Sequence, residues 1–430
     1  MLKPLSDQHR IAKTINQRPP QSSITPGREN RQVLYIWPYL EWAGAQIYFM
    51  SIMKLAKEHY HVRAIMPAGS DSKILGYMQR IGVNCEFFSA HLDTSPARTV
   101  WEKVKRRLRN AYCSLVIVQY LSHKPLKHVI LHLDMAPWSS FWLLSYLSLR
   151  SNVNVTLHSA VPRLPWLRRL EWQFKFRILS FIPGFRLLVS NRDMLKSLKS
   201  YLSDRYLSSV PIAYTGVDTN EIRQALEARP DRDWLYKKHD LPAGRFLVFS
   251  VGQIIPRKGC LVLINAIKKL HAFRPPLFFV WIGDGAQRNE IERSIEQDGL
   301  HDSFKIIKPA DIGPARLDLL ELIQLADVFV HPSFYEGLPG AILEAMALGK
   351  ACVASRVNGI PEAIQDRETG LLIPAGDSAA LAAAITELVR DSALRERLAR
   401  NGQAYVNKHF DERIAAQITV RHYDACRQGL

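Results

Sequence analysis

The sequence predicts an α/β protein of two Rossmann-like, doubly wound domains that face a cleft, and three observations support this. Apolar runs of strand length alternate with helix-like runs along most of the chain. Such alternation is typical of parallel sheets covered by helices on both faces. The chain has 430 residues, which is too long for one ordinary core. Its hydrophobic content of 47% is that of a globular protein.

The first series of elements predicts an N-terminal domain over residues 32–205. Residues 1–31 are polar and lack the apolar core of a signal peptide, which indicates a disordered tail. Residues 135–149 are apolar but too few to span a bilayer, so they predict a buried helix. Helices are expected at 47–59 and 74–81. Strands are expected at 31–39, 61–66, 115–119, 128–133, 153–158 and 186–190.

A second series predicts a C-terminal domain over residues 206–405. Strands are expected at 245–252, 277–283, 304–308, 328–330, 351–355 and 370–374. Helices are expected at 261–273, 286–297, 315–325 and 341–348, with one or two more over 378–401. Ligands of doubly wound sheets bind beyond the carboxyl ends of the strands. The loops of both domains are therefore expected to gather in the cleft between them.

The charge of the chain is concentrated in its first half. The formal net charge is +17, and residues 1–200 contain 29 Lys and Arg against 11 Asp and Glu. Residues 100–112 and 161–186 interleave these basic residues with Trp, Phe and Leu. Such segments can lie on anionic lipid, although an ordinary amphipathic helix with a solvated basic face fits equally well. Without a nucleic-acid-binding motif, no nucleic acid partner is expected.

The five cysteines give no sign of a disulfide framework or a zinc site. They are scattered, odd in number and without Cys-x-x-Cys spacing. This usage fits a reducing cytosol, so a cytoplasmic location is expected.

The segment "FYEGLPGAILEAMALGK" (334–350) carries two carboxylates around a helix start. Pro339 suits the first turn of a helix, so backbone N–H groups near residues 338–341 are expected to face the crevice beyond the strand. A helix N-terminus favours an anion such as a diphosphate. Glu336 and Glu344 can then accept hydrogen bonds from hydroxyls on either side of that diphosphate. Alternatively, one complements the helix dipole and the other is solvated.

Two further motifs concern phosphate and dinucleotide binding. "SVGQIIPRKG" (250–259) places Lys258 just before a helix, where it can reach a phosphate. "WIGDGAQR" (281–288) resembles the start of a dinucleotide fingerprint, but Arg288 stands where the third glycine is required. A nicotinamide cofactor is therefore not expected.

Five segments taken in order resemble the family 4 glycosyltransferases, which have the GT-B fold and transfer a sugar from a nucleotide donor with retention of configuration. The likeness covers about residues 32–410 and is strongest over 210–375. The segments are "AYTGVDTNEI", "VGQIIPRKG", "IGDG", "DVFVHPSFYEGLPGAILEAMALGKACVAS", and "GIPEAI" with "TGLLIPAGD".

The resemblance assigns roles to the residues of the C-terminal half. It implies that Lys258 contacts the donor diphosphate, Glu336 the hydroxyls of the donor sugar and Glu344 the ribose diol. It also implies that the backbone around the helix start cradles sugar and phosphate. The residues of this cradle are Leu338, Pro339, Gly340 and Ala341.

The same resemblance reaches the N-terminal half and shows where the sequence departs from the family. His158 matches the active-site histidine near the reacting carbon, and Gly44 belongs to the loop that closes on the phosphates. Gln253 stands where the family usually has the diphosphate arginine. A neutral amide binds a phosphate more weakly than a guanidinium, so Arg257 is the expected substitute. Residues 406–430 are expected to form a helix that packs back on the N-terminal domain.

The expected activity is that of a retaining, hexosyltransferase-like enzyme that needs no metal and no cofactor beyond its nucleotide-diphosphate sugar. The expected acceptor is a saccharide or lipid-linked saccharide of cell-surface polysaccharide or glycolipid synthesis, with a possible anionic membrane surface as partner of the N-terminal domain. Asp231 and Asp233 form an Asp-x-Asp far from the other motifs, so no metal site is assigned to them. A same-fold epimerase or phosphorylase, or a non-catalytic nucleotide-sugar or glycan-binding module, remains the alternative.

Overall fold

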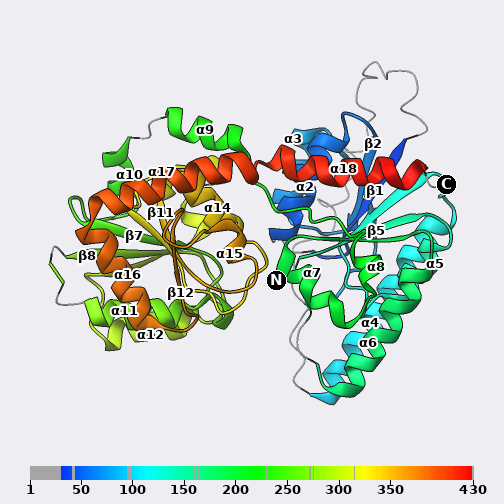
Figure 1. Cartoon of the computed structure of the whole chain (residues 1–430), viewed down its shortest axis with the longest axis horizontal. Helices are drawn as coiled ribbons and strands as arrows, with labels where there is room; N and C mark the ends of the chain where they lie inside the picture. Colours follow the sequence, from blue (N-terminus) through cyan, green and yellow to red (C-terminus); the bar gives the residue numbers. More distant parts are fainter. Residues whose placement is uncertain are drawn as a thin grey trace, which may run out of the picture.

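The chain folds around two six-stranded parallel sheets, one in each half (Figure 1). This arrangement confirms the predicted α/β class with two Rossmann-like domains. A computed structural model provides the coordinates, and the predicted tail lies outside the described residues apart from residue 31. The described residues are 31–40, 44–93, 99–158, 161, 164–228, 231–270, 273–274, 276–313 and 315–428.

The sheet of the N-terminal domain has the strand order β3-β2-β1-β4-β5-β6. The order in which the strands follow the chain reverses between β1 and β4, as in nucleotide-binding Rossmann domains. All neighbouring strands run parallel. The strands are β1 (Gln32–Ile36), β2 (His61–Pro67), β3 (Asn84–Phe88), β4 (Val129–Leu133), β5 (Asn152–Leu157) and β6 (Phe185–Val189).

Both faces of this sheet are buried, because successive strand side chains point to opposite sides. Val33 and Tyr35 of β1 pack with α2 (Gly44–Ala56) and α3 (Ser72–Ile81). Leu34 and Ile36 pack on the other face. That face is covered by the helices α4 (Val100–Ser122), α5 (Phe141–Ser148) and α6 (Trp166–Phe181). The short helices α7 (Arg192–Ser197), η1 (Leu198–Ser200) and α8 (Asp204–Leu207) also pack on it.

Two predictions for this domain were wrong. The predicted strand at 115–119 is part of α4, because Cys113, Ile117 and Leu121 recur every four residues and are buried on one face of that helix. The predicted buried helix at 135–149 begins only at Phe141, and Trp142 within it is 83% exposed. The strand β3 was not predicted.

The sheet of the C-terminal domain has the order β12-β11-β10-β7-β8-β9, which repeats the pattern of the first sheet. The chain order reverses between β7 and β10. The strands are β7 (Phe246–Val251), β8 (Leu277–Ile282), β9 (Phe304–Ile307), β10 (Val328–His331), β11 (Ala351–Ser355) and β12 (Leu371–Ile373).

Helices cover both faces of this second sheet. One face packs against α9 (Thr219–Ala228), α10 (Arg232–Lys238), α13 (Arg316–Ile323), α14 (Gly340–Ala347) and α15 (Ile360–Ala363). The other packs against α11 (Cys260–Leu270), α12 (Arg288–Gln297) and α16 (Ser378–Arg390), while α17 (Ser392–His409) contributes to both. The short turns η2 (Pro256–Lys258) and η3 (Pro309–Asp311) lie in connecting loops.

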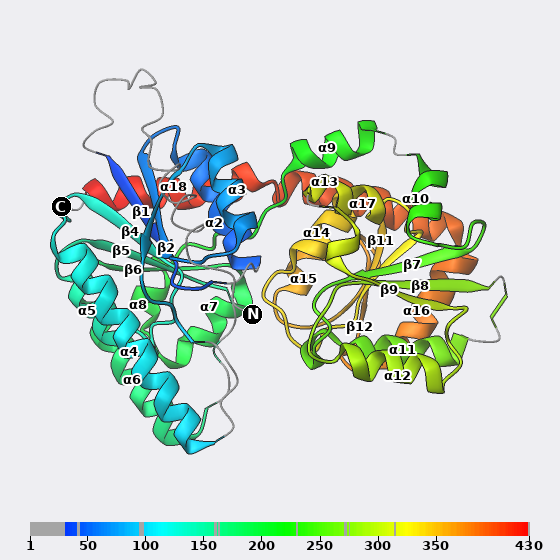
Figure 2. The same cartoon turned by 180° about the vertical axis from the view of Figure 1, so that it is seen from behind.

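Two segments cross between the domains, and they pair with each other. The N–H of Val217 donates to the carbonyl of Phe410 at 2.8 Å, and the N–H of Glu412 donates to the carbonyl of Val217 at 2.9 Å. After the second crossing, α18 (Glu412–Gln428) runs along the N-terminal domain against α2 (Figure 2). The crossing is therefore a paired hinge rather than a single loose linker.

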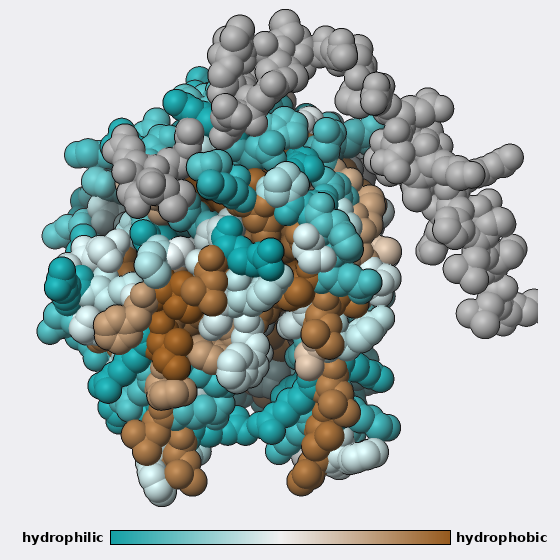
Figure 3. All heavy atoms as spheres, turned by 90° about the vertical axis from the view of Figure 1, so that its right-hand side faces the viewer, coloured by the Kyte–Doolittle hydropathy of each residue, from teal (hydrophilic) through white to brown (hydrophobic). Residues whose placement is uncertain are grey.

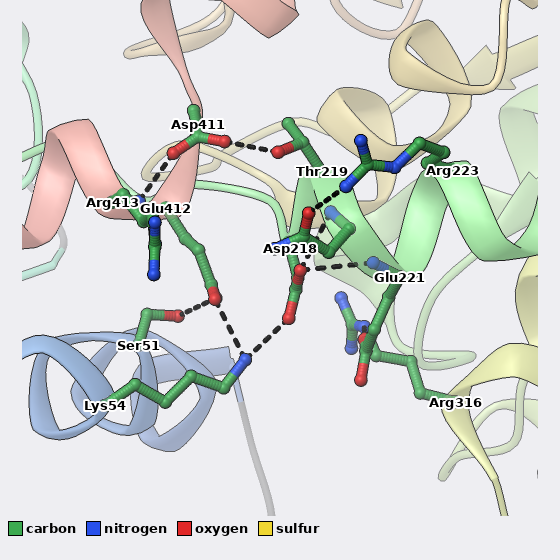
Figure 4. A network of polar contacts seen from close by, with 11 residues as sticks. Ser51, Lys54, Asp218, Thr219, Glu221, Arg223, Arg316, Asp411, Glu412 and Arg413 are labelled. Carbon is green, nitrogen blue, oxygen red and sulfur yellow. Dashed lines mark hydrogen bonds and ion pairs between the residues drawn. The ribbon is translucent and has the colours of Figure 1, made fainter.

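An ion-pair network fixes this hinge to the N-terminal domain (Figure 4). Lys54 of α2 donates to Asp218 at 2.6 Å and to Glu412 at 2.9 Å. Ser51 also donates to Glu412, at 2.8 Å. One ammonium of the N-terminal domain thus holds a carboxylate from each crossing segment.

Candidate functional site

The basic and acidic residues of the candidate site follow β7 and β10, the neighbouring strands between which the chain order reverses. Lys258 lies in η2 after β7, and Glu336 lies in the loop after β10. The Lys258 Nζ is 2.5 Å from Glu336 Oε1, and an Arg257 guanidinium nitrogen is 3.1 Å from Oε2. This is the place where doubly wound sheets bind ligands.

Glycine allows the two loops to approach each other. Gly259 has φ +73°, and a β-carbon there would lie 2.0 Å from the carbonyl oxygen of Pro332. The left-handed conformation and this contact both require glycine. The side chain of Lys258 passes beside Gly252, whose missing β-carbon would lie 3.6 Å from Lys258 Cδ. Gly259 therefore lets the loop of Lys258 approach the end of β10, whereas a β-carbon at Gly252 would make only an ordinary van der Waals contact with Lys258.

Glu336 is a buried carboxylate, only 5% exposed, at the centre of a hydrogen-bond cluster. Its Oε1 also accepts from Ser333 Oγ at 2.8 Å and contacts His331 Nε2 at 2.9 Å. Burial by itself raises the pKa of Glu336, but His331 and Lys258 outweigh burial and hold the pKa well below its usual range. The side chain is therefore ionised at neutral pH.

One oxygen of the Glu336 carboxylate, Oε2, has fewer hydrogen-bond partners than the other. Burial lowers the pKa of His331, so its ring is neutral, and its Nε2 must carry the proton because a carboxylate only accepts. Within the described part of the chain, Glu336 Oε2 accepts only from Arg257. Oε2 can therefore accept another hydrogen bond, such as one from a sugar hydroxyl.

The helix α14 follows this loop and carries the second glutamate. Pro339 precedes its first residue and makes no side-chain cap, so the first N–H groups, of Gly340 and Ala341, have no partner within the helix. Glu344 is 5% exposed, and its Oε1 accepts a hydrogen bond from Arg316. The helix start can bind an anion, with Glu344 one turn further on.

His158 reaches the site from the N-terminal domain, directly after β5. Its ring packs edge-on against Tyr48, with centroids 4.9 Å apart, and against Phe49. Burial lowers its pKa to about 4, so the ring is neutral at pH 7. Its Nε2 is buried without a hydrogen-bond partner among the described residues. The Nε2 atom thus has unused hydrogen-bonding capacity, and the role of His158 beside the reacting carbon stays a prediction.

The loop of Glu336 is also tied to the N-terminal domain by residues that the sequence analysis missed. Asn358 accepts from the N–H of Glu336 at 3.2 Å and donates to Asp193 at 3.0 Å. Glu362 accepts from the N–H groups of Arg192 and Asp193, at 2.8 and 3.2 Å. The Gly-Ile-Pro-Glu turn after β11 was the available signal for these contacts.

Of the remaining predicted residues that the structure describes, only Arg257 donates a hydrogen bond to Glu336. Gly44 is the first residue of α2, and residues 41–43 before it lie outside the described residues. Gln253 is exposed and takes no part in the described contacts around Glu336, whereas Arg257 does. Asp231 accepts from the N–H of Trp234 and so caps α10. The roles assigned to all of these residues stay predictions.

Comparison with known proteins supports the fold and a glycosyltransferase relationship of the C-terminal domain. Residues 231–405 match the family model of the glycosyl transferases group 1. A lipopolysaccharide core biosynthesis glycosyltransferase, LpsD of Rhizobium meliloti (strain 1021), is 29% identical over 214 residues, 50% of this chain and 58% of the relative. An N-acetylgalactosaminyltransferase of Campylobacter jejuni, which is named for N,N'-diacetylbacillosaminyl-diphospho-undecaprenol, is 42% identical over 26% of this chain and 29% of the relative. The match to LpsD spans a little over half the length of that relative.

Solved structures share the fold. A glycosyltransferase from Rickettsia africae superposes with a TM-score of 0.71 at 16% identity, covering 93% of this chain and all of the other. HepE of Anabaena, solved in complex with UDP, gives a TM-score of 0.70 at 18% identity over 92% of this chain and all of the other. Both have the two-domain arrangement described above. Residues 231–405 thus match the group 1 glycosyl transferases, and the chain as a whole shares its two-domain fold with solved glycosyltransferases.

Proposed function

We propose that the protein is a retaining glycosyltransferase that moves a sugar from a nucleotide-diphosphate donor to a saccharide or lipid-linked saccharide. The observation that carries this proposal is the contact of Lys258 with Glu336 beside the start of α14. An ammonium and a helix N-terminus suit a diphosphate, and the neighbouring carboxylates suit hydroxyls. HepE, which shares this fold, was solved in complex with UDP, and this supports a nucleotide ligand.

The same residues suit departure of a diphosphate without a metal. As the bond between the sugar and the diphosphate breaks, negative charge grows on the diphosphate, where Lys258 and the N–H groups of α14 can stabilise it. The acceptor hydroxyl attacks from the same face, and its proton passes to the departing phosphate oxygen. Glu336 Oε2 would hold a donor-sugar hydroxyl, and neutral His158 would lie near the reacting carbon.

The acceptor class is supported by the names of the relatives. LpsD is named for lipopolysaccharide core synthesis, and the Campylobacter relative for a sugar linked to diphospho-undecaprenol. We therefore propose that the reaction belongs to the synthesis of a cell-surface polysaccharide or glycolipid, and we propose the cytoplasmic face of the membrane as its location.

Two helices of the N-terminal domain offer a surface for such a membrane. In α4 the exposed apolar residues are spaced for one helical face opposite the buried one, and α6 repeats the pattern. They are Trp101, Val104, Leu108, Tyr112 and Leu115 on α4, and Trp166, Leu167, Leu170 and Phe174 on α6. Figure 3, which views this side of the molecule, shows an apolar row along each of two projections.

Basic residues accompany both rows. They are Lys103, Lys105, Arg106, Arg107 and Arg109 on α4, and Arg168, Arg169, Lys175 and Arg177 on α6. Apolar rows flanked by cations fit an anionic lipid surface, to which each basic residue contributes about 1 kcal/mol. Within the described ranges, no helix combines the length and apolar content that crossing a bilayer requires.

Purified protein assayed with a panel of nucleotide sugars tests the proposed activity. We expect release of free nucleoside diphosphate that increases when saccharide acceptors are added, and Lys258→Met should lower the rate by about 10²- to 10³-fold. Lys305→Met, which removes an exposed ion pair with Asp240, is the matched control. Binding of nucleotide sugars without turnover across a broad acceptor panel would instead identify a non-catalytic binding module.

A further inference from the structure

The guanidinium of Arg316 lies between two carboxylates from different helices. It donates to Glu344 Oε1 of α14, and its Nε is 3.5 Å from Glu221 Oε2 of α9. The Arg316 side chain is 27% exposed, whereas that of Glu344 is 7% exposed. Arg316 is thus the group that neutralises a nearly buried carboxylate, and no local pattern in the sequence indicated this.

The contact with Arg316 involves only one of the two carboxylate oxygens of Glu344. Oε1 is occupied by Arg316, and Oε2 accepts no hydrogen bond from the residues that the structure describes. Arg316 holds Oε1 through one guanidinium nitrogen, while its Nε faces Glu221. Because Oε1 is held and the Glu344 side chain is nearly buried, the positions open to Oε2 are restricted.

Arg316 is itself anchored toward the hinge (Figure 4). Its second partner, Glu221, lies in the first turn of α9, and the N–H of Glu221 donates to Asp218 Oδ1 at 3.1 Å. The other oxygen of Asp218 accepts from Lys54 of the N-terminal domain. A continuous series of polar contacts therefore leads from α2 through the hinge to Glu344.

We propose that Arg316 is a positioning residue for the nucleoside half of the donor. It orients Glu344 so that Oε2 accepts hydrogen bonds from the ribose hydroxyls, and it compensates the glutamate charge close to an anionic diphosphate. This inference rests on the proposed function, in which Glu344 binds the ribose diol. Glu221 supports the same orientation indirectly, because its carboxylate binds the guanidinium of Arg316, which in turn binds Glu344.

Calorimetric titration of the full chain with UDP, GDP and ADP, with their 2′-deoxy forms and with inorganic pyrophosphate, tests this role. We expect the wild type to bind one ribonucleotide about tenfold more tightly than its deoxy form, which is the effect of one hydrogen bond of about 1.4 kcal/mol. Arg316→Gln should weaken ribonucleotide binding about tenfold and abolish the preference over the deoxy form. Pyrophosphate binding should not change.

Three further variants separate positioning from general stability. Arg316→Lys should restore part of the preference for ribose, and Glu221→Gln should weaken it less than Arg316→Gln does. Arg400→Gln, which removes an exposed ion pair with Glu396 on α17, should change nothing. Thermal unfolding of each variant checks that the fold is intact.

The possible outcomes distinguish this inference from the proposed function. If Arg316→Gln weakens the binding of the ribonucleotide and of its deoxy form equally, so that the ribose preference is kept, Arg316 is only structural and the inference is wrong. Tighter binding by Arg316→Gln would also overturn it, because Arg316 would then compete with the ribose for Glu344. A wild type that binds none of the nucleotides would reject the proposed function and this inference together.

Discussion

The carbonyl oxygen of His158 lies so close to Gly337 that a β-carbon at position 337 would approach it to 2.2 Å. His158 directly follows β5 of the N-terminal domain, and Gly337 follows Glu336 in the C-terminal domain. A second glycine continues the contact, because a β-carbon at Gly359 would lie 2.2 Å from the carbonyl oxygen of Gly337. At His158 and Gly337 the two domains therefore meet backbone to backbone, beside the side-chain contacts of Asn358 and Glu362.

Gly337→Ala should separate His158 from the loop of Glu336. A distance of 2.2 Å to a backbone oxygen is far below van der Waals contact, so the loop or the whole domain must shift. Because a misplacement of about 1 Å can cost about 10²-fold in rate, we expect a loss of at least tenfold in kcat/KM for sugar transfer. Steady-state kinetics with the donor found by the nucleotide-sugar panel measures this.

The control for this substitution is Gly76→Ala in α3. No heavy atom lies within 4 Å of a β-carbon at Gly76. Alanine is favoured over glycine within a helix by about 1 kcal/mol, so this variant should be slightly more stable and fully active. Equal activity of Gly337→Ala and Gly76→Ala would show that the contact with His158 does not set the geometry of the site.

Lys54→Met should destabilise the hinge and make the stability of the protein depend more strongly on pH. Without the ammonium, the carboxylates of Asp218 and Glu412 face each other unneutralised. The three side chains are between 13% and 29% exposed, so the cost should lie between those of surface and buried pairs, about 1–3 kcal/mol. Thermal unfolding compared at pH 5 and pH 8 measures it.

The sign of this pH dependence follows from the two carboxylates. Burial raises the pKa of Glu412, and Asp218 raises it further against the effect of Lys54. Once Lys54 is removed, protonation of Glu412 at low pH relieves the repulsion, so the loss should be larger at pH 8 than at pH 5. Adding Glu412→Gln to Lys54→Met should restore part of the stability; a loss independent of pH would contradict this account.

The sequence predicted the elements whose residues bury an apolar face or form a known turn. The strands of both sheets other than β3, and the turns that bring Lys258 and Glu336 together, belong to this group, because strands, glycine-rich turns and helix starts leave local signals. The helix at residues 115–119 was missed because three consecutive β-branched residues, Val116 to Val118, favour a strand locally. In the structure, burial of Ile117 against the sheet outweighs this preference.

The partners of the predicted site residues could not be predicted in this way. Arg316 precedes Glu344 by 28 residues, and His331 contacts Glu336 only because the chain turns back after β10. Lys54 is separated from Glu412 by 358 residues. Such contacts depend on how whole elements pack, which leaves no pattern in the neighbouring sequence.

Trp101→Glu combined with Trp166→Glu should weaken binding to anionic vesicles. Each substitution replaces an exposed aromatic side chain, on α4 or on α6, by a glutamate, whose negative charge is repelled by anionic lipid. We expect the wild type to float with vesicles that contain anionic lipid, and the double variant to lose at least tenfold in partition. Flotation at low and high salt measures how much of the vesicle binding is electrostatic.

Trp234→Glu provides the control for flotation, because Trp234 is 52% exposed on α10 of the other domain. This variant should float like the wild type. Equal partition of the wild type onto neutral and anionic vesicles, unaffected by salt, would reject a membrane role for α4 and α6.

His422 should make the docking of α18 sensitive to acid. Burial lowers the pKa of this histidine to about 4, with Arg186 adding to the effect, whereas an unfolded histidine titrates near 6.5. Between these values the folded chain binds fewer protons than the unfolded chain, so stability must fall as the pH falls. From pH 6.5 to pH 5 this amounts to at most about 2 kcal/mol.

His422→Gln should remove that part of the pH dependence, while His301→Gln, at an exposed position, should leave it intact. Unfolding free energies of the three proteins at pH 6.5 and pH 5 measure the difference. His158 is also buried and neutral, so the His422 variant should retain some acid sensitivity. Identical slopes for the wild type and His422→Gln would contradict this account, because they would mean that His422 has the same pKa in the folded and in the unfolded chain.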